Sequence, residues 1–298
     1  MTTSNSSLTN SSLDTFSLAG FQVRRVGFGA MQLPGPGVMG PPRDHDEAIA
    51  VLRRAVELGV NHIDTAQYYG PDVSNELIRE ALYPYADDLA LVSKVGAVRD
   101  AQGGWLPAQQ PHELRSGVED NLRTLGVEQL AAVNLRLLDH VPDGYTAPPL
   151  EDMLAEMVAL RDEGKIAGVG ISTASLDEVE TAIRLADIVC VQNAFSLVDQ
   201  SDQAVLDRCA ADGIAYVPYF PLGSAFPGMP KVTDDPAVQQ VATRLEASPA
   251  QVGLAWLLAH SPNVLVIPGT SSVAHLEQNL ASGSIELSQE DLALLNDR

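Results

Sequence analysis

The stretch "DHDEAIAVLRRAVELGVNHID", residues 44–64, contains a complete helix-to-strand unit. Asp44 and Glu47 form a capping-box pattern ahead of a helical apolar stripe in "DEAIAVLRRAVELG". A glycine ends the helical pattern, and the short run "NHID" that follows is typical of a buried strand. The stretch therefore predicts a helix that packs beside a strand, which is the repeating unit of α/β proteins.

The same alternation continues along the chain. Ser175 with Glu178, and Ser248 with Gln251, repeat the capping-box pattern ahead of helical stripes. Short apolar runs typical of strands occur at residues 26–31, 61–64, 89–96, 132–138, 166–172, 188–193, 214–220 and 264–269. Eight such units, with no break in composition, predict one closed (β/α)₈ TIM barrel of the α/β class over residues 14–298 rather than a doubly wound sheet.

Two segments lie outside this repeat. "FSLAGFQVRRV", residues 16–26, predicts an N-terminal β-hairpin that turns at Ala19-Gly20 and plugs the N-terminal end of the barrel. Residues 1–13 are polar, with neither a basic region nor an apolar core of the kind found in signal peptides. We expect them to form a disordered polar tail.

The composition excludes several classes of function. The chain has 298 residues, of which 45% are hydrophobic, so it contains enough apolar surface for a globular core. Its formal charge of −21 argues against nucleic-acid and anionic-membrane partners, because such binding depends on Lys and Arg. Only Cys190 and Cys209 are present, which favours a reducing compartment and a cytoplasmic location.

Barrel enzymes carry their active sites at the carboxyl ends of the strands, and three residues there fit together chemically. Asp64 ends the run "NHID", Tyr69 follows in the next loop, and Lys94 lies near the end of the run 89–96. A phenol donates a proton poorly unless a cation stabilises its phenolate, and Lys94 would supply that cation while Asp64 holds the ammonium. The three residues therefore predict a tuned general acid, although Asp64 as a helix cap and Tyr69 as a core aromatic remain alternatives.

Other residues near the strand ends are open to more than one interpretation. We expect Tyr68 to pack beside Tyr69, and Trp105, in a long loop, either to line the substrate pocket or only to pin that loop. Trp256 on a helical apolar stripe indicates core. His62 and Asp64 form an H-x-D pair, but no second cluster of metal ligands follows, so we expect no metal. The glycine-rich segment 27–40 lacks the order of a dinucleotide fingerprint and is interpreted as a loop over cofactor or substrate.

Six segments of the chain resemble the aldo-keto reductase family. They are "DTAQYYG", "LVSKVG", "GKIAGVGIS", "VCVQNAF", "YFPLGS" and "IPGTSSVAHLEQNL". They occur in one order and with matching spacing, and the resemblance runs from about Phe16 to Asn279. "GAMQLPGPGVMGPPRD" and "NLRLL" look more narrowly like the pyridoxal reductase branch.

The resemblance implies roles for particular residues. Tyr69 would be the acid/base residue tuned by Asp64 and Lys94, and Arg136 stands where many members have a catalytic histidine. Ser172, Gln192 and Asn193 would hold the nicotinamide carboxamide, and Tyr219 would stack on its ring. The whole cofactor site would comprise Ala30, Met31, Ser172, Thr173, Gln192, Asn193, Tyr219, Pro221, Leu222, Gly223, Gly269, Thr270, Ser271, Ser272, His275 and Asn279.

This chain departs from the family pattern at several of these positions. Thr173 stands where members have asparagine, and Gly269 and His275 stand where Lys or Arg commonly binds the ribose 2′-phosphate. Hydroxyl groups at a helix N-terminus still favour a phosphate, so NADPH is the expected coenzyme and NADH the alternative. Arg136 would polarise the aldehyde or only pair with Asp64 or Asp139.

The expected activity is NAD(P)H-dependent reduction of a small aldehyde or ketone, with pyridoxal to pyridoxine as the specific hypothesis. The alternative from another class is a non-catalytic, nucleotide-sensing regulatory barrel. The expected partner is a small carbonyl substrate, and the protein is expected to be a monomer or a weak homo-oligomer.

Overall fold

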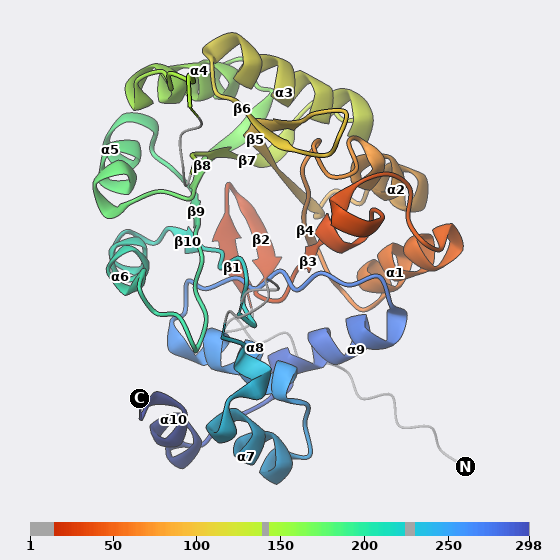
Figure 1. Ribbon diagram of the computed structural model, residues 1–298, viewed down its shortest axis with the longest axis vertical. Coiled ribbons are helices and arrows are strands. Elements are labelled where there is room, and N and C mark those ends of the chain that lie inside the picture. Colours follow the sequence, from red (N-terminus) through yellow and green to blue (C-terminus); the bar gives the residue numbers. More distant parts are fainter. Residues whose placement is uncertain (1–14, 139–142, 224–229, 298) are drawn as a thin grey trace.

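The computed structural model describes residues 15–138, 143–223 and 230–297, and a ring of helices surrounds its strands (Figure 1). The tail expected at residues 1–13 lies outside this part of the chain. Parallel strands follow one another in the order β10-β9-β8-β7-β5-β4-β3. Their bounds are Phe28–Gly29 (β3), His62–Asp64 (β4), Ala90–Arg99 (β5), Leu130–Arg136 (β7), Ile166–Ser172 (β8), Cys190–Gln192 (β9) and Ala215–Tyr216 (β10). The predicted α/β barrel is confirmed.

The eighth apolar run closes the barrel without forming a regular strand. Val264 pairs with Tyr216 and Val266 pairs with Val26 as isolated parallel bridges. The Gly27 amide donates to the Val266 carbonyl at 2.8 Å, and the Leu265 amide donates to the Tyr216 carbonyl at 2.9 Å. The prediction of a full strand over residues 264–269 was therefore too long, because Pro268 has no N–H with which to extend the ladder.

In the described part of the chain, helices follow the barrel around, and a further pair lies outside it (Figure 1). The barrel helices are His45–Glu57 (α1), Val73–Leu82 (α2), Pro111–Leu125 (α3), Leu150–Asp162 (α4), Leu176–Ala186 (α5), Gln203–Asp212 (α6), Pro249–His260 (α8) and Val273–Ala281 (α9). The outer pair, Pro236–Leu245 (α7) and Gln289–Asn296 (α10), is joined by an Arg244–Asp291 ion pair.

The capping predictions are confirmed at two of three helices. Ser175 and Glu178 form a complete capping box at α5, as do Ser248 and Gln251 at α8. At α1 the Asp44 side chain accepts from the Glu47 amide at 3.0 Å, but the Glu47 carboxylate does not return to Asp44. It accepts instead from the Val273 amide at the start of α9, which no local pattern predicts.

The N-terminal hairpin plugs the barrel as predicted. Strands Thr15–Leu18 (β1) and Phe21–Arg24 (β2) join through Ala19 and Gly20, whose φ angles of 49° and 89° suit a tight hairpin turn. Leu18 and Val23 pack against a cluster of mostly small side chains from the barrel interior: Ala90, Val92, Ala131, Ala132, Cys190, Ala215, Val217 and Leu265. Because several of these residues begin their strands, the hairpin covers the end of the barrel where the strands start.

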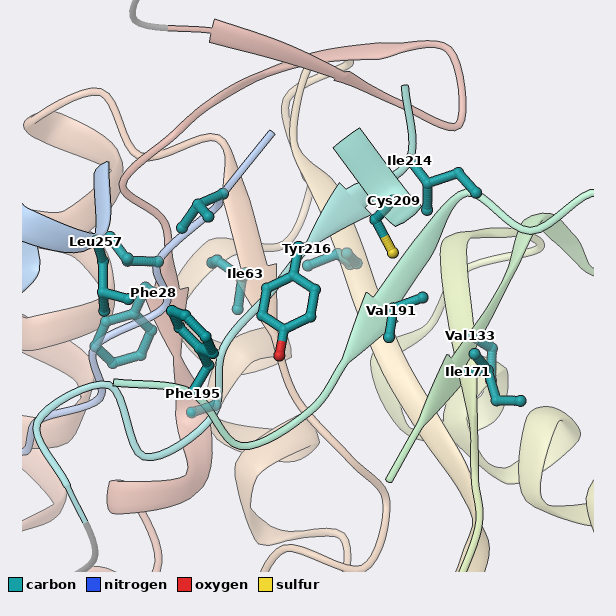
Figure 2. Packing of buried hydrophobic residues seen from close by; sticks show 14 of the residues in the cluster. Phe28, Ile63, Val133, Ile171, Val191, Phe195, Cys209, Ile214, Tyr216 and Leu257 are labelled. Atoms are coloured by element: carbon teal, nitrogen blue, oxygen red, sulfur yellow. The ribbon is translucent and has the colours of Figure 1, made fainter. Parts of the chain in front are cut away.

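The larger core lies between the strands and the helices. Figure 2 shows strand residues Ile63, Val133, Ile171 and Val191 together with Phe195, whose ring lies 5.8 Å from the ring of Tyr216. Trp256 is fully buried, and its indole N–H donates to Asn296 of α10 at 2.8 Å, which confirms its assignment to the core.

One strand was missed by the sequence analysis. Trp105–Ala108 (β6), expected as loop, pairs antiparallel with the extension of β5, and Trp105 lies opposite Arg99. The pairing partner comes from β5 running past the barrel rim to Arg99, which its apolar pattern does not show. Among the described residues, no helix is long and apolar enough to cross a membrane.

Candidate active site

A buried ion pair lies at the centre of the site. Asp64 ends β4, Lys94 lies on the neighbouring β5, and the Lys94 ammonium donates to Asp64 Oδ1. The ammonium also donates to the Thr65 carbonyl at 3.1 Å. Both side chains are almost fully buried, at 8% and 3% exposed. A buried pair of this kind is retained only when further hydrogen bonds satisfy both charges.

Gln192 supplies one of those bonds. It is the last residue of β9, and its amide Nε2 donates to Asp64 Oδ2 at 2.7 Å. The two carboxylate oxygens of Asp64 therefore accept from different strands. This arrangement fixes the carboxylate in the barrel mouth and brings three of the predicted site residues together.

Tyr69 lies in the loop that follows β4. Its amide donates to the Ala66 carbonyl at 3.0 Å, and Gly70 continues the turn with a φ of 105°. A Cβ at Gly70 would lie 2.3 Å from that of Val73, so only glycine fits. The Tyr69 ring centre lies 5.1 Å from the Lys94 ammonium, and its hydroxyl bonds to no group in the described part of the chain.

The electrostatic surroundings keep this phenol protonated. Burial raises the pKa of Tyr69, the Asp64 carboxylate raises it further, and the Arg136 guanidinium lowers it. Burial likewise raises the pKa of Tyr68. Tyr69 is therefore a neutral proton donor at physiological pH, and Arg136 is the cation that favours its ionised form.

Aromatic and cationic side chains line the next part of the barrel mouth. Tyr68 meets Tyr69 edge to face at 5.4 Å between ring centres, and it meets Trp105 in the same way at 5.3 Å. The guanidinium of Arg136 lies 5.6 Å from the Trp105 ring, and that of Arg99 lies 4.1 Å from it. The structure thus brings together both predicted pocket residues and adds Arg99, which only the pairing of β5 with β6 reveals.

The residues predicted to hold the nicotinamide differ in how far the protein already engages their polar groups. Ser172 ends β8 and stands in register between Arg136 and Gln192, so these three side chains leave adjacent strand ends. The Asn193 amide is already engaged, because it donates to the Ala174 carbonyl at 2.7 Å and to Asp202 at 2.9 Å. Thr173, with a φ of 61°, turns the chain between Ser172 and Ala174.

The remaining predicted cofactor residues surround this edge of the barrel. Tyr219 is half-buried after β10 and meets Phe220 edge to face at 5.2 Å. Pro221, Leu222 and Gly223 continue from it. Ala30 is buried, whereas Met31 packs against the cluster that contains Tyr68 and Tyr69. Met31 therefore lies on the catalytic side of the site.

The predicted phosphate loop is partly satisfied by the protein itself. Thr270 Oγ1 accepts from the Ser272 amide at 3.1 Å, and Glu47 accepts from the Val273 amide at 3.0 Å. A Cβ at Gly269 would lie 2.6 Å from the Gly29 carbonyl oxygen, so no lysine or arginine fits at that position. Ser271 and His275 are exposed, and Asn279 is half-buried on α9. The role of Glu47 here could not be predicted, because its local sequence pattern assigns it to the cap of α1.

His62 lies two residues before Asp64 on β4 and is 1% exposed. Burial lowers the pKa of His62 to about 4, so its ring is neutral. Within residues 15–138, 143–223 and 230–297, no group of three or more His, Cys, Asp or Glu side chains is placed to hold a metal ion.

Comparison with known proteins places this geometry in a family. Residues 25–297 match the model of the aldo/keto reductase family. The chain is 49% identical to pyridoxine 4-dehydrogenase of Escherichia coli strain K12, over 96% of this chain and 98% of that protein. It is 38% identical to an uncharacterized oxidoreductase of Schizosaccharomyces pombe, over 99% and 93% of the two chains. A solved aldo/keto reductase of Klebsiella pneumoniae in complex with NADP and acetate has a TM-score of 0.78 and 25% identity, covering 95% of this chain and 94% of that one.

Proposed function

Because the chain belongs to the aldo/keto reductase family and is an NAD(P)-dependent oxidoreductase, we propose that it interconverts pyridoxal and pyridoxine with NADPH as coenzyme. The observation that carries the catalytic part is the buried, neutral Tyr69 phenol beside the Asp64–Lys94 ion pair. The similarity to a pyridoxine 4-dehydrogenase supports the substrate. A cytoplasmic location and a monomeric or weakly associated state stay predictions.

The residues at the strand ends fit a nicotinamide coenzyme. Ser172 is a buried hydroxyl whose nearest polar side chain, Thr173 Oγ1, is a distant 3.5 Å away, so it has bonding capacity for a carboxamide. Gln192, at the next strand end, has a second amide hydrogen and an oxygen for the same group. The half-buried ring of Tyr219 would stack on the nicotinamide. The start of α9 would take the phosphate end.

The bound coenzyme supplies the hydride that reduces the carbonyl carbon. Tyr69 donates its hydroxyl proton to the carbonyl oxygen as that oxygen gains charge. Asp64 holds the Lys94 ammonium 5.1 Å from the Tyr69 ring centre, and Arg136 lowers the pKa of Tyr69, so both cations lie where they favour the tyrosinate left behind. In the direction of pyridoxine oxidation the tyrosinate takes the proton back.

The pocket wall suits a substrate with an acidic hydroxyl beside its aldehyde. Arg136 and Arg99 both lie against Trp105, close to the two tyrosines, in a protein whose overall charge is strongly negative. A guanidinium remains charged at every accessible pH and donates in a planar fork. The 3-hydroxyl of pyridoxal would accept from Arg136 while the pyridine ring packs against the aromatic side chains.

The test is coenzyme oxidation by the purified protein across a panel of aldehydes. We expect NADPH oxidation with pyridoxal, slower oxidation with NADH, and weaker activity with pyridine-4-carbaldehyde, which lacks the hydroxyl. Activity on simple aldehydes with none on pyridoxal would exclude pyridoxal as the substrate, but the protein would still be an aldehyde reductase. Tight NADPH binding with no oxidation of any aldehyde would instead favour the regulatory barrel.

Arg136→His tests how the pocket selects its substrate. The change removes a permanent charge that lowers the pKa of Tyr69, so the apparent pKa of the catalytic acid should rise. We expect kcat/KM to fall more for pyridoxal than for pyridine-4-carbaldehyde, while the Kd for NADPH stays unchanged. The alternative is that Arg136 only pairs with Asp64, whose oxygens each accept one bond and have room for another, or with Asp139, which lies outside the described residues. Equal losses on both aldehydes, with no change of pKa, would make Arg136 a structural residue.

A further inference from the structure

A cluster of buried polar side chains lies on the outer face of the barrel wall, behind the catalytic residues. Four of its members are fully buried and the fifth is 4% exposed. They come from the end of β4, from α2, from β5 and from α3. The members are Thr65, Asn75, Ser93, Asn121 and Thr124.

Two asparagines connect the cluster. Thr65 Oγ1 donates to Asn75 Oδ1 at 2.8 Å, and Asn75 Nδ2 donates to Asn121 Oδ1 and to Thr124 Oγ1, each at 2.9 Å. Ser93 Oγ donates to the same Asn121 oxygen at 2.6 Å. The Asn121 amide in turn donates to the Gly117 carbonyl at 2.8 Å. Each amide group therefore has partners on both its oxygen and its nitrogen, as a stable buried network requires.

This network holds the sequence neighbours of the catalytic ion pair. Successive side chains of a strand point to opposite faces, so Asp64 and Lys94 face the barrel interior while Thr65 and Ser93 face outward. Thr65 has a second link, because its carbonyl accepts from the Lys94 ammonium at 3.1 Å. A displacement of Thr65 or Ser93 would thus move Asp64, Lys94 or the bond between Lys94 and the backbone.

A pocket adjoins this part of the wall. A cavity of about 240 Å³ adjoins Lys94, Tyr68 and Gln67 on one side and Gly117 and Asn121 on the other. Side chains next to such a space lack neighbours that would hold them by contact. The hydrogen bonds from α2 and α3 therefore act on β5 beside Lys94 in addition to the ladders that pair β5 with β4 and β7.

Stability by itself gives little reason for so many polar groups. Well-packed apolar side chains of the same volume are often as stabilising as a buried polar network, whereas a network specifies one geometry. An interior position between helix and strand ordinarily carries Val, Ile or Leu. The polar cluster therefore occurs where the positions of Asp64 and Lys94 are set.

We propose that Asn75 and Asn121, through Thr65 and Ser93, are positioning residues that set the Lys94 ammonium and the Asp64 carboxylate relative to the Tyr69 hydroxyl. This inference rests on the proposed reductase function. Thr65 and Ser93 act through Asp64 and Lys94, their neighbours in the chain, and Asn75 and Asn121 act through their bonds to Thr65 and Ser93.

Substitutions at Thr65 separate positioning from packing. Thr65→Val keeps the side-chain volume and removes the hydroxyl that donates to Asn75, whereas Thr65→Ser keeps the hydroxyl and loses a buried methyl group. We expect Thr65→Val to lower kcat for aldehyde reduction by about ten-fold or more, with KM and the Kd for NADPH changed by less than about three-fold. Thr65→Ser should retain kcat even if its melting temperature falls further.

The pH profile provides a readout that lost stability would not change. If the Lys94 ammonium moves away from Tyr69 in Thr65→Val, the tyrosinate is less stabilised and the apparent pKa for alcohol oxidation should rise. Ser93→Ala should act in the same direction. Ser261→Ala is the matched control, since it also removes a buried hydroxyl bond, of 2.6 Å to Asn263, but at the opposite end of the barrel. It should lower stability and leave the pH profile unchanged.

A crystal structure of Thr65→Val completes the test, because it does not depend on turnover. The inference expects the Lys94 ammonium to be displaced from its contact with the Thr65 carbonyl. Normal kcat and an unchanged pH profile in Thr65→Val, measured against an active parent protein, would overturn the inference. A parent protein that oxidises NADPH with no aldehyde, yet whose Thr65→Val variant shows a displaced Lys94, would overturn the proposed function instead.

Discussion

At the scale of single residues, the site depends on how Asp64, Lys94 and Arg136 affect the ionisation of the Tyr69 phenol. Lys94 is engaged by Asp64 and by the Thr65 carbonyl, so much of its charge is compensated. Arg136 is the cation that lowers the pKa of Tyr69, against burial and Asp64, which raise it. Arg136 therefore has a direct electrostatic effect on the proposed proton donor.

Tyr69→Phe should lower kcat by about 10²-fold or more, because the ring still packs but the proton donor is gone. The Kd for NADPH should stay nearly unchanged. Tyr68→Phe is the matched control, since the Tyr68 hydroxyl is buried without a hydrogen-bond partner among the described residues. Steady-state kinetics of both variants decide between them: a large loss in Tyr68→Phe and none in Tyr69→Phe would assign the proton donor to Tyr68.

His62 predicts a specific loss of stability in acid. Burial lowers the pKa of His62 to about 4, below the ordinary histidine value. Between these two pKa values His62 is protonated in the unfolded chain and neutral in the folded protein. The contribution of the neutral His62 to stability is complete above about pH 6.5 and is lost as the pH falls toward 4. The free energy of unfolding should therefore fall by about 2 kcal/mol between pH 7 and pH 5. Urea unfolding at both pH values should show a smaller decline for His62→Leu than for the parent.

His112, which is exposed on α3, provides the control for this experiment. His112→Leu should decline with pH as the parent does. Parallel declines of His62→Leu and the parent would show that His62 does not remain neutral in the fold.

At the scale of elements, the start of α9 is controlled by α1. Glu47 accepts from the Val273 amide, so the first amide of α9 is already bonded and a negative charge lies beside the predicted phosphate site. Gly269 excludes a cation at its own position because the chain passes too close to Gly29. The packing of α1 against α9 thus bears on coenzyme choice.

Glu47→Gln should strengthen NADPH binding relative to NADH by about two- to five-fold, because it removes a charge that repels the 2′-phosphate while the glutamine oxygen can still accept from the Val273 amide. Asp46→Asn is the matched control, since Asp46 is a fully exposed acid in the same helical turn. Fluorescence titration of both coenzymes gives the ratio of Kd values. The same change in the ratio of Kd values in both variants would mean that coenzyme preference depends on the overall negative charge of the protein and not on the position of Glu47.

At the scale of the whole molecule, the plug and the site lie at opposite ends of the barrel. Leu18 and Val23 pack where strands begin, whereas Asp64, Arg136, Ser172 and Gln192 stand where strands end. A barrel divided in this way allows stability and catalysis to change separately.

Leu18→Ala should therefore lower the free energy of unfolding by about 2–4 kcal/mol, through lost burial and the cavity left behind, and leave kcat within about two-fold. Leu185→Ala is the control, because Leu185 is 44% exposed and its truncation should cost little. Denaturant unfolding and steady-state kinetics measure the two effects. A fall in kcat of the same order as in a catalytic variant would show that the hairpin supports the site.

The sequence by itself determined the features that consecutive residues encode. Helical and strand periods, the capping boxes at α5 and α8, and the Ala19-Gly20 turn are local, because each depends on backbone and side chains a few residues apart. The chemistry of Asp64, Tyr69 and Lys94 was also readable, since a barrel places strand ends together whatever their distance in sequence.

Tertiary structure alone decided which distant groups meet. Glu47 and Val273 are 226 residues apart, and only the closure of the barrel makes the first the partner of the second. Other contacts also depend on the closed barrel. They are the β-bridges of Val264 and Val266, the pairing of Trp105 with Arg99, and the hydrogen bonds from Asn193 to Ala174 and Asp202. A buried polar group forms a hydrogen bond with whichever partner the fold brings within about 3 Å. That partner is distant in the sequence, so no local sequence pattern predicts it.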